Sequence, residues 1–472
     1  MLLRLIYDDK LAQASYLLGC QACGEAIVID PNRDADQYIR LARKEGVRIT
    51  HVTETHIHAD YLSGSRELAH RTGAKLVLSA HGGDDWSYRF PEMSSVQSVR
   101  DGDRFKVGNI QIEVMHTPGH TPEHICFLVT DTAAADKPIG LFSGDFVFVG
   151  DVGRPDLLEK AAGVANTMDA SARALYKSLQ RFNQLPDYMQ VWPGHGAGSS
   201  CGKALGAVPQ TTVGYEKMFN PALTTQSEQQ FVDFILAGQP EPPKYFATMK
   251  RLNRDGPPLL NALPAPVKMD ARELDGVMQA GTMIVDTRVA LNFARGHVPG
   301  SINIPYNKSF TNWAGWLIPY DRDFALILDE RTSAADVARD LALIGLDNVQ
   351  GYFGEDAVKS WADPERTVSI RTAEMVELAN RDDAVVIDVR NTNERQAGHV
   401  PGTIHIPLGE LADRAGELPR DKPIAVHCQG GGRAAIGASV LQSLGFEQVL
   451  HVRGGYTEWQ HQSAAPQVSD GD

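Results

Sequence analysis

Residues 54–64 read ETHIHADYLSG and continue the β-type run RITHVTET at 48–55. His56, His58 and Asp60 stand at alternate positions in this stretch. Alternate residues of an extended segment point to the same side, so we expect these three side chains to share one side. Imidazole nitrogens and carboxylate oxygens are common ligands of divalent transition metals. The stretch therefore predicts a metal site where a strand runs into a loop.

Three later segments supply further histidines and an aspartate, each where a β-type run meets a loop. They are MHTPGHT with His116 and His120, SGDF with Asp145, and WPGHGAG with His195. A single histidine of this kind is most simply a scattered polar loop residue, but four such segments in one order favour a shared site. Around them, residues 1–240 alternate β-type runs such as AIVID with helical stretches such as ASARALYKSLQRF. This alternation predicts an α/β or layered αββα domain.

The order of ligand types resembles the metallo-β-lactamase superfamily, whose members carry HxHxDH, a later His, a later Asp and a final His. One position departs from the pattern, because Tyr61 stands where the superfamily has the last His of HxHxDH. A phenol is a much poorer ligand than imidazole for a borderline divalent ion. In the superfamily that histidine belongs to the second metal of the dinuclear hydrolases. The resemblance therefore implies a single metal and points to the persulfide dioxygenases.

Similarity to the persulfide dioxygenases implies one Fe(II) per chain, held by His56, His116 and Asp145. Three protein ligands of this kind leave adjacent positions where a substrate sulfur and O₂ can meet on the metal. The other polar residues of the motifs are then expected beside the ligands, where they orient ligands or substrate without binding the metal. These residues are His58, Asp60, Tyr61 and His195.

An internal repeat follows a proline-rich stretch. IVDTRVALNFARGHVPGSINIPYN at 284–307 matches VIDVRNTNERQAGHVPGTIHIPLG at 386–409. A repeat of about a hundred residues is longer than a solenoid unit and indicates two copies of an independently folding domain. The shared positions include Asp286 and Asp388, Arg288 and Arg390, Gly296 and Gly398, His297 and His399, and Pro305 and Pro407.

In the second copy the β-type run IAVHC ends at Cys428, and QGGGR and a helical segment follow. Backbone N–H groups and the positive end of a helix surround a thiol at such a junction, which stabilises a thiolate or persulfide anion. This loop, with VIDVR and GHVPGTIHIP, resembles the rhodanese family of sulfurtransferases. The resemblance implies that Cys428 carries a persulfide, that Asp388 and Arg390 support the loop, and that the loop consists of Gln429, Gly430, Gly431, Gly432 and Arg433.

The first copy lacks a cysteine at the corresponding position. Aligning Gly345 with Gly445 places Leu328 or Asp329 opposite Cys428. This copy therefore cannot hold a persulfide. We expect it to persist as a structural spacer or as a contact in a homo-oligomer.

These segments divide the chain into an αββα metallo-β-lactamase sandwich followed by two α/β rhodanese domains with central parallel sheets. Prolines in the connecting segment cannot continue helices or central strands, which predicts a linker there. The predicted parts are a dioxygenase domain at 1–240, a Pro-rich linker at 241–266, a rhodanese-like domain without the catalytic Cys at 267–364, an active rhodanese domain at 365–466 and a tail at 467–472.

Composition and charge narrow the range of partners. Apolar residues make up 43% of the 472 residues and charged residues 22%, as in globular proteins. A net charge of −14 argues against nucleic-acid and anionic-membrane partners, because both require clustered Lys and Arg. The N-terminal MLLRLIYDDK predicts a first strand and not a signal peptide, and no run approaches the roughly 20 apolar residues that span a bilayer. Five cysteines are too sparse for a disulfide framework, so we expect a cytoplasmic protein.

The remaining cysteines leave alternatives open. Cys201 lies shortly after the final histidine and is equally compatible with a sulfur relay at the metal site and with a passive loop thiol. Cys20 is a second candidate for a sulfur relay, whereas Cys23 in the same CxxC is expected to be structural because no second pair follows. Arg154 and Asp156, in a segment that also resembles the dioxygenases, are expected to form a structural ion pair.

Together these parts predict a non-haem Fe(II) persulfide dioxygenase and sulfurtransferase. It would use O₂ to oxidise the terminal sulfur of a low-molecular-weight thiol persulfide to sulfite, and the persulfide on Cys428 would convert sulfite to thiosulfate. One alternative is a zinc-dependent thioester hydrolase of glyoxalase-II type, which Tyr61 disfavours because it removes the second metal. Another is a sulfur-carrier or sensing protein in which the metal domain only binds a ligand.

Overall fold

The computed structural model of the chain describes residues 1–90, 96–160, 167–360, 369–374 and 383–464. Residue contacts divide the chain into two compact units, Met1–Leu263 with Arg339–Gly345 and Pro264–Ala338 with Leu346–Asp472. The predicted tail at 467–472 lies outside the described residues. None of the helices that the structure describes is long and apolar enough to cross a bilayer.

The first unit begins with a six-stranded sheet in which the strand order follows the sequence. Its first three strands pair antiparallel, and the third to sixth pair parallel. Two helices form the crossover connections from the third strand to the fourth and from the fourth to the fifth. The elements are β1 (Leu2–Asp8), β2 (Gln13–Cys20), β3 (Glu25–Ile29), α1 (Ala35–Lys44), β4 (Arg48–Thr53), α2 (Ser65–Thr72), β5 (Lys75–Ser79) and β6 (Val96–Val99).

A second six-stranded sheet follows in the same unit. Its order is β12-β11-β10-β9-β8-β7, and only β10 and β11 pair parallel. The elements are β7 (Arg104–Val107), β8 (Ile110–His116), β9 (Ile125–Asp131), β10 (Gly140–Gly144), α3 (Leu157–Lys160), α4 (Met168–Phe182), β11 (Gln190–Pro193), β12 (Thr211–Thr212), α5 (Val213–Phe219) and α6 (Glu228–Leu236).

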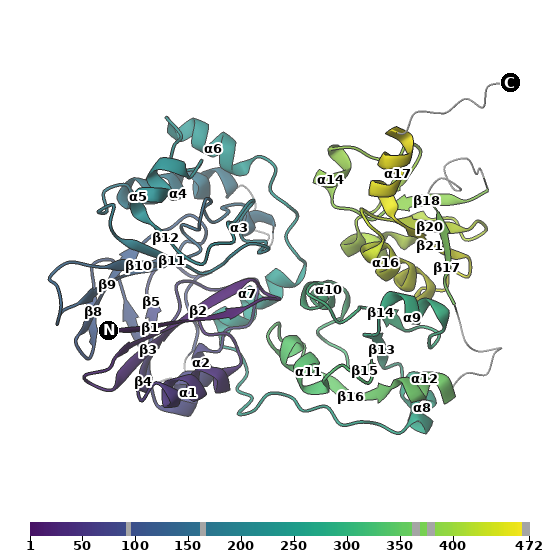
Figure 1. Cartoon of the computed structure of the whole chain (residues 1–472), viewed down its shortest axis with the longest axis horizontal. Helices are drawn as coiled ribbons and strands as arrows, with labels where there is room; N and C mark the ends of the chain where they lie inside the picture. Colours follow the sequence, from purple (N-terminus) through teal and green to yellow (C-terminus); the bar gives the residue numbers. More distant parts are fainter. Residues whose placement is uncertain (91–95, 161–166, 361–368, 375–382, 465–472) are drawn as a thin grey trace. The chain divides into compact units, whose positions relative to one another are not determined.

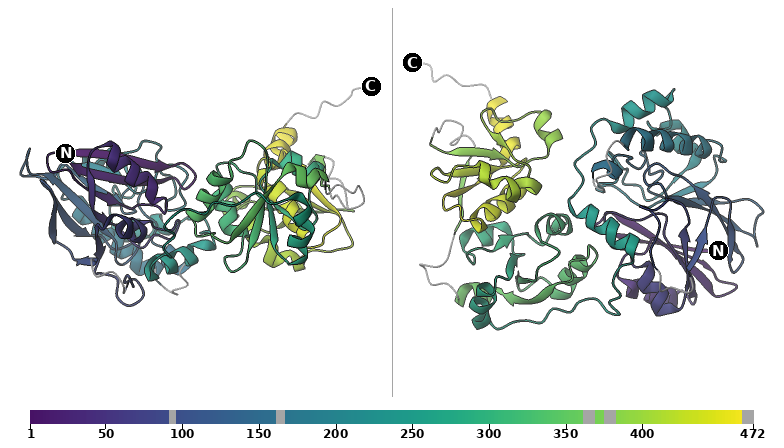
Figure 2. Two further views of the ribbon diagram at one scale, coloured as in Figure 1. Left: turned by 90° about the horizontal axis from the view of Figure 1, so that it is seen from below. Right: turned by 180° about the vertical axis from the view of Figure 1, so that it is seen from behind.

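The two sheets lie face to face between two layers of helices (Figure 1; Figure 2 gives the views from below and from behind). Strand β3 shows how the sequence produces this arrangement. Ile27 and Ile29 belong to the apolar cluster between the sheets, whereas Ala26 and Val28 belong to the cluster that faces α1 and α2. Successive strand residues point to opposite faces, so an uninterrupted apolar run buries both faces of a strand. A third cluster packs the second sheet against α4 and α6, completing the predicted αββα sandwich.

Part of the predicted linker forms helix α7 (Tyr245–Asp255), which belongs to the first unit. The prolines of this segment flank the helix and do not interrupt it. The buried Asn253 side chain donates to the carbonyls of His58 and Tyr61 (2.8 Å each) and accepts from the N–H of Ser63 (2.9 Å). These residues of the segment are therefore ordered and fix the loop that carries the HxHxD motif.

The first repeat forms a four-stranded parallel sheet in the order β14-β13-β15-β16. Its central strands β13 and β15 are short and largely buried, as in a sheet covered by helices on both faces. The elements are η1 (Ala271–Glu273), α8 (Leu274–Gln279), β13 (Met283–Asp286), α9 (Ala290–Arg295), β14 (Ile302–Asn303), α10 (Phe310–Leu317), β15 (Phe324–Leu328), α11 (Ala334–Ala342), β16 (Val349–Gly354) and α12 (Glu355–Ser360).

The second repeat forms a five-stranded parallel sheet in the order β17-β21-β20-β18-β19, with β20 at its centre. The elements are β17 (Arg371–Glu374), β18 (Val385–Asp388), α14 (Thr392–Gln396), β19 (Ile404–His405), η2 (Leu408–Glu410), α15 (Leu411–Arg414), η3 (Ala415–Glu417), β20 (Ile424–His427), α16 (Gly432–Ser443), β21 (Val449–Arg453) and α17 (Gly455–Ala464). Both repeats thus have the central parallel sheets that the sequence predicts.

Strand register identifies the residue that replaces Cys428 in the first repeat. Asp388 pairs with His427, the residue before Cys428. The equivalent Asp286 pairs with Ile327, the residue before Leu328. Of the two alternatives left by the sequence, Leu328 therefore occupies the position of the cysteine.

Candidate functional site

Loops at the ends of three strands bring two histidines and one aspartate together in the first unit. His56 follows β4, His120 lies between β8 and β9, and Asp145 follows β10. Their ligand atoms lie within 4.8 Å of one another. Asp145 Oδ2 is 3.5 Å from Nε2 of His120 and 3.9 Å from Nε2 of His56. All three side chains are buried, and we refer to them as the first cluster.

Hydrogen bonds determine which ring nitrogen of each histidine is free to bind a metal. The Thr55 hydroxyl donates to Asp30 (2.9 Å), so it accepts from Nδ1 of His56 (3.0 Å). Nδ1 of His120 donates to the carbonyl of Arg154 (3.0 Å). A neutral imidazole that donates through Nδ1 has its lone pair on Nε2. Both Nε2 atoms of the first cluster are therefore available as ligands.

Burial suits the first cluster to a cation. Burial, reinforced by neighbouring histidines, lowers the pKa of His56 well below its usual value, and burial also lowers the pKa of His120. Both rings are thus neutral at pH 7, the form that binds metals. Within the described part of the chain, neither carboxylate oxygen of Asp145 has a hydrogen-bond partner. An uncompensated buried carboxylate is costly, so these residues fit a divalent cation.

The structure corrects one predicted ligand, because His120 and not His116 completes the first cluster. His116 ends β8, where its Nε2 donates to the Pro122 carbonyl (2.8 Å) and its ring stacks on His81 with 3.7 Å between centroids. The chain then turns at Gly119, whose φ of 146° is one that L side chains rarely adopt. This turn places the His120 side chain in the buried first cluster. The motif MHTPGHT contains both histidines and does not indicate which of them turns inward.

Further contacts hold Asp145 and His120 in place. The N–H of Asp145 donates to Nε2 of the buried His124 (3.1 Å). Arg154, whose carbonyl orients His120, is fully buried and donates twice to Asp156 (2.8 and 2.7 Å). Arg154 and Asp156 thus form the expected structural pair. His124 is a supporting residue that the sequence did not single out, since nothing in its spacing separates it from a core histidine.

His58 and Tyr61 lie beside the first cluster and hold its loop. Nε2 of His58 donates to Asp30 Oδ1 (3.1 Å). Burial opposes charge on His58, but the Asp30 carboxylate outweighs it and raises the pKa of His58 to about 9. A protonated imidazole has no lone pair to offer a metal. The Tyr61 hydroxyl donates to the Asp30 carbonyl (3.3 Å), so both residues are placed as orienting residues.

A second cluster contains Asp60, His195 and Cys201, whose ligand atoms also lie within 4.8 Å of one another. Nε2 of His195 is 3.2 Å from Asp60 Oδ2 and 3.5 Å from Asp145 Oδ1. Asp145 thus presents Oδ2 to the first cluster and Oδ1 to the second. The structure places Cys201 directly beside the metal centre.

Cys20 lies at the opposite end of the first sheet from both clusters. Cys20 pairs with Glu25, which pairs with Arg48 at the start of β4, whereas His56 follows the other end of β4. At about 3.3 Å per residue this separation exceeds roughly 20 Å. The Cys20 sulfur instead accepts from the N–H of Asn109 (3.3 Å). This position corrects the prediction that Cys20 relays sulfur at the metal site.

The loop around Cys428 encloses the thiol and places one backbone N–H group against it. The thiol is 2% exposed, and the N–H of Gly431 donates to its Sγ (3.1 Å). Gly431, at φ 101°, immediately precedes α16, which begins at Gly432. Gly455 packs against the Cys428 carbonyl so closely that a Cβ atom there would lie 2.1 Å from the oxygen. The backbone therefore fixes the thiol at the junction of strand and helix.

Side chains fix both ends of this loop. Arg433 donates twice to Glu394 (2.5 and 2.6 Å). Burial lowers the pKa of Arg433, but Glu394 and the neighbouring Cys428 raise it, so the charge remains beside the sulfur. Gln429 accepts from Arg390 (3.1 Å) at the other end. Glu394 is a partner of Arg433 that the sequence did not indicate, because it lies far from the loop in sequence.

An aspartate and arginine pair occurs at the same place in both repeats. Arg390 donates to Asp388 (2.8 Å) and to a glycine carbonyl in the following turn (2.8 Å). Arg288 makes the same two bonds, to Asp286 (2.6 Å) and to the corresponding glycine carbonyl (3.1 Å). Only the second repeat has a cysteine beside the pair. The pair is therefore a structural element of the fold.

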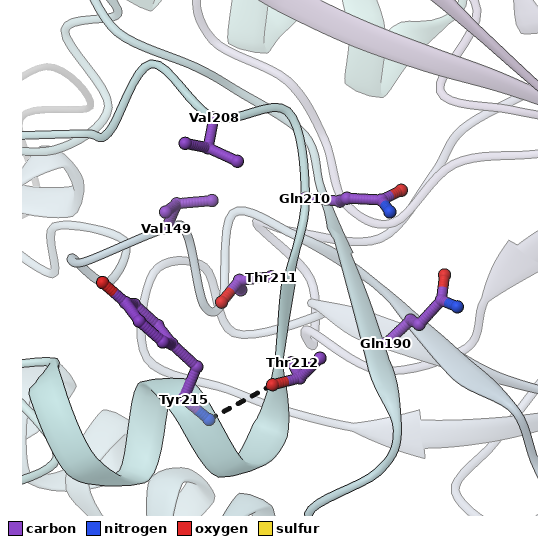
Figure 3. Close-up of a pocket in the computed structure, with 7 residues that line it drawn as sticks. All are labelled: Val149, Gln190, Val208, Gln210, Thr211, Thr212 and Tyr215. Atoms are coloured by element: carbon purple, nitrogen blue, oxygen red, sulfur yellow. Dashed lines mark hydrogen bonds between the residues drawn. The ribbon is translucent and has the colours of Figure 1, made fainter.

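A separate pocket of about 430 Å³ lies beside β11 and β12 in the first unit. Figure 3 shows its lining, and the dashed line marks the hydrogen bond from the Tyr215 N–H to the Thr212 hydroxyl (3.2 Å) that caps α5. The lining side chains contain no histidine, cysteine or carboxylate, so this pocket is distinct from the metal centre. They are Val149, Gln190, Val208, Gln210, Thr211, Thr212 and Tyr215.

Family profiles match both parts of the chain. The metallo-β-lactamase superfamily profile matches residues 8–195, and the rhodanese-like domain profile matches residues 270–355 and 372–462. The crystal structure of a metallo-β-lactamase from Staphylococcus aureus subsp. aureus COL is 43% identical, with a TM-score of 0.67. This match covers 75% of the present chain and 98% of the other, so it extends beyond the first domain.

Each of three curated relatives matches less than half of the chain. A hydroxyacylglutathione hydrolase of Rhodospirillum rubrum is 32% identical over 180 residues, which are 38% of this chain and 60% of the relative. The mitochondrial persulfide dioxygenase of Bos taurus is 29% identical over 234 residues, 48% of this chain and 78% of the relative. A β-lactamase hydrolase-like protein of Xylella fastidiosa is 30% identical over 250 residues. The chain spans only 53% of this last relative's length.

Proposed function

Because the chain belongs to the metallo-β-lactamase superfamily in its first domain and carries two rhodanese-like domains, we propose that it is a persulfide dioxygenase and sulfurtransferase. Its first reaction converts a low-molecular-weight persulfide, RSSH, with O₂ and H₂O into RSH, sulfite and two protons. Its second reaction transfers a sulfane sulfur from Cys428 to sulfite and forms thiosulfate. Likeness to the persulfide dioxygenase of Bos taurus supports the first reaction, and the rhodanese-like domains support the second.

The first cluster is the observation that carries this proposal. His56, His120 and Asp145 would hold one Fe(II), which supplies the redox chemistry that O₂ requires and leaves positions for a substrate sulfur. The hydrogen bonds from Nδ1 of both histidines keep their rings from turning away. Burial of all three ligands excludes bulk water from the reacting sulfur.

The Cys428 loop would perform the transfer. The Cys428 thiolate attacks the outer sulfur of a second persulfide, the sulfur–sulfur bond breaks, and RSH leaves after taking up a proton. The Gly431 N–H and the Arg433 guanidinium stabilise the resulting anionic sulfur. Sulfite then attacks that outer sulfur, and the electron pair of the broken bond returns to Cys428. Thiosulfate is released and the thiolate is restored.

The proposed partners are a low-molecular-weight thiol persulfide, O₂ and sulfite, without nucleic acid or membrane. The net charge of −14 and five free cysteines support a cytoplasmic setting. The repeat without a catalytic cysteine is proposed as a contact in a homo-oligomer.

Product analysis of Cys428→Ser tests the coupling of the two reactions. With a thiol persulfide as substrate, O₂ uptake continues because the first cluster is intact, and sulfite accumulates in place of thiosulfate. The measurement is an oxygen-electrode trace together with chromatographic separation of sulfite and thiosulfate. Cys23→Ser, which alters an exposed thiol, is the matched control and retains thiosulfate formation. Unchanged thiosulfate output from Cys428→Ser would show that the two domains are not coupled in this way.

A second candidate function is thioester hydrolysis, which the likeness to a hydroxyacylglutathione hydrolase favours. Metal analysis of anaerobically purified protein separates the two. Stoichiometric iron with persulfide-dependent O₂ uptake supports the dioxygenase. Zinc in the first cluster, with release of thiol from a glutathione thioester and no O₂ uptake, supports the hydrolase instead.

A further inference from the structure

Two cysteines at the turn between β2 and β3 take no part in the proposed reactions. Cys20 is the last residue of β2, and Cys23 lies shortly before Glu25, the first residue of β3. Cys20 is 4% exposed, whereas the Cys23 side chain is exposed to solvent. All five cysteines lie in the described part of the chain, and Cys23 is the only exposed one among them. A small molecule in solution therefore meets Cys23 first.

The backbone of this turn brings the two cysteines to a separation that suits a disulfide bond. The N–H groups of Cys23 and Gly24 both donate to the Cys20 carbonyl (3.2 and 2.9 Å). A turn of this kind holds its first and fourth Cα atoms less than about 7 Å apart. Disulfides in proteins join residues whose Cα atoms are about 4.4–6.8 Å apart. A bond between Cys20 and Cys23 is therefore compatible with the turn as it stands.

The turn between β7 and β8 packs against both cysteine side chains. A Cβ atom added at Gly108 would lie 2.7 Å from Cβ of Cys20, 2.9 Å from Sγ of Cys20 and 2.9 Å from Cβ of Cys23. Both side chains thus lie against one point of the neighbouring turn. The N–H of Asn109 in that turn donates to Sγ of Cys20 (3.3 Å). The sulfur of Cys20 therefore has a fixed position between the two turns.

Hydrogen bonds favour a thiolate at Cys20. Burial raises the pKa of Cys20, but the Asn109 N–H, the Cys23 thiol and nearby backbone N–H groups outweigh burial and lower the pKa of Cys20 overall. The hydrogen bond with Cys20 raises the pKa of Cys23. A thiolate next to an exposed thiol can accept the proton of that thiol and can later attack its sulfur.

The two sulfurs do not belong to a metal site. Within the described residues, neither of the two groups of side chains that could hold a metal ion contains Cys20 or Cys23. A structural zinc site takes four ligands, and this turn offers only two thiols. The arrangement therefore suits the chemistry of a dithiol.

We propose that Cys20 and Cys23 form a redox-active dithiol that exchanges reversibly with a low-molecular-weight disulfide, RSSR. Cys23 gives its proton to Cys20 and attacks one sulfur of RSSR, whose sulfur–sulfur bond breaks. The leaving RS⁻ takes the proton back from Cys20 and departs as RSH. The Cys20 thiolate then attacks Sγ of Cys23, and the second RS⁻ leaves and takes a proton from solvent. The two cysteines are thereby oxidised to one disulfide, and RSSR is reduced to two RSH.

This inference goes beyond the proposed function and does not rest on it. Both cysteines lie at the end of the first sheet opposite the first cluster, and the exchange involves neither O₂ nor Cys428. Because thiol–disulfide exchange is reversible, the oxidation state of the pair would follow the ratio of RSH to RSSR.

Oxidised glutathione is the probe that tests this proposal. The parent protein is the full chain with Cys428→Ser, in which Cys23 is the one exposed cysteine. After incubation, acid quenching and alkylation, mass spectrometry is expected to find a disulfide between Cys20 and Cys23 that reduced glutathione reverses. Adding Cys20→Ser is expected to trap at least about 10-fold more glutathione on Cys23, because the thiol that would displace it is absent. Adding Cys126→Ser, which removes another buried thiol, is the matched control and leaves the disulfide unchanged.

Cys23→Ser in the same parent provides a second measurement that alters no buried side chain. Its Cys20 is expected to take up at least about 10-fold less glutathione than Cys23 does in the Cys20→Ser variant, because Cys20 is buried. Far-ultraviolet circular dichroism establishes that each variant is folded; if Cys20→Ser fails to fold, the parent and Cys23→Ser decide. The proposal is overturned by a parent that stays reduced in excess oxidised glutathione, that stops at a mixed disulfide on Cys23, or that forms disulfides only between chains. Persulfide-dependent O₂ uptake of the wild type is measured separately, so a failure of the proposed function is recognised independently.

Discussion

Two histidines only four positions apart have different surroundings, and only one of them belongs to the first cluster. His120 faces Asp145, whereas His116 stacks on His81 at the end of β8. His120→Ala is expected to lower iron affinity more than about 10-fold, because it removes a ligand and not merely a residue that orients one. His116→Ala is expected to retain iron. Iron per chain after anaerobic reconstitution and dialysis measures both variants. Equal loss of iron from both would refute the assignment.

His427, the last residue of β20, makes stability depend on pH. It is fully buried, and burial lowers the pKa of His427 to about 4. An unfolded histidine titrates near pH 6.5, so between about pH 6.5 and 4 only the unfolded chain takes up this proton. The contribution therefore decreases stability as pH falls through this window, by up to about 3 kcal/mol.

His427→Gln removes this titration and keeps a side chain of similar size. Urea unfolding of the wild type and the variant between pH 7 and pH 4.5 is the measurement. The wild type is expected to lose more stability than the variant on acidification, while the other titrating groups contribute equally to both. Parallel pH dependences in the two proteins would show that His427 is not held neutral.

Residue types and their order predicted which strand ends carry the candidate site, but they did not predict the direction of each side chain. The strand-to-loop positions of His56, Asp145 and Cys428 follow from local patterns, because strands end where their apolar runs end. Whether His116 or His120 turns inward depends on one glycine conformation between them. Such a choice is set by tertiary packing and leaves no periodic signal.

At the scale of elements, the turn between β21 and α17 determines the shape of the Cys428 loop. Gly455 adopts a φ of 55°, and a Cβ atom there would lie 2.1 Å from the Cys428 carbonyl oxygen. Gly455→Ala is expected to displace the end of β20, abolish sulfur transfer and cost about 1–3 kcal/mol of stability. Gly416→Ala is the matched control, since Gly416 lies outside the Cys428 loop and a Cβ atom there meets no atom within 4 Å.

Thiosulfate formation and thermal unfolding of the two alanine variants check this prediction. Gly416→Ala is expected to retain both properties of the wild type. Retained sulfur transfer in Gly455→Ala would mean that the loop tolerates a shifted carbonyl.

The sequence predicted most of the helices and strands, and helix α7 is an exception. Alternating β-type and helical runs predicted the sandwich, and the repeat predicted two parallel sheets. Helix α7 was not predicted, because the prolines on either side of it indicate a linker. Its order depends on the buried Asn253, which binds the backbone of the loop at His58 and Tyr61. A contact between residues so distant in sequence has no local signature.

At the scale of the whole molecule, the first repeat allows a test of whether a cysteine alone would make this fold transfer sulfur. In that repeat the Asp329 carboxylate accepts from the N–H of Arg331 and the hydroxyl of Thr332 (2.9 Å each). A thiol at Leu328 would thus stand beside a carboxylate, whereas the sulfur of Cys428 accepts from the N–H of Gly431. Leu328→Cys, made together with Cys428→Ser, is expected to restore no thiosulfate formation.

Alkylation by iodoacetamide at pH 7 provides the quantitative comparison. The introduced thiol is expected to react at least about 10-fold more slowly than Cys428, because a neighbouring carboxylate disfavours the thiolate. The same variant should keep the thermal stability of the Cys428→Ser parent. Rapid alkylation with thiosulfate formation would show that the fold alone activates a thiol.

The aspartate and arginine pair occurs in both repeats, so the two repeats can be compared within one chain. The first repeat retains the pair, the parallel sheet and the turn, but it has Leu328 where the second repeat has Cys428. Features present in both repeats are those that the fold itself requires. Features confined to the second repeat are those that the proposed sulfur transfer would require, namely the glycine loop, Arg433 with Glu394, and Cys428.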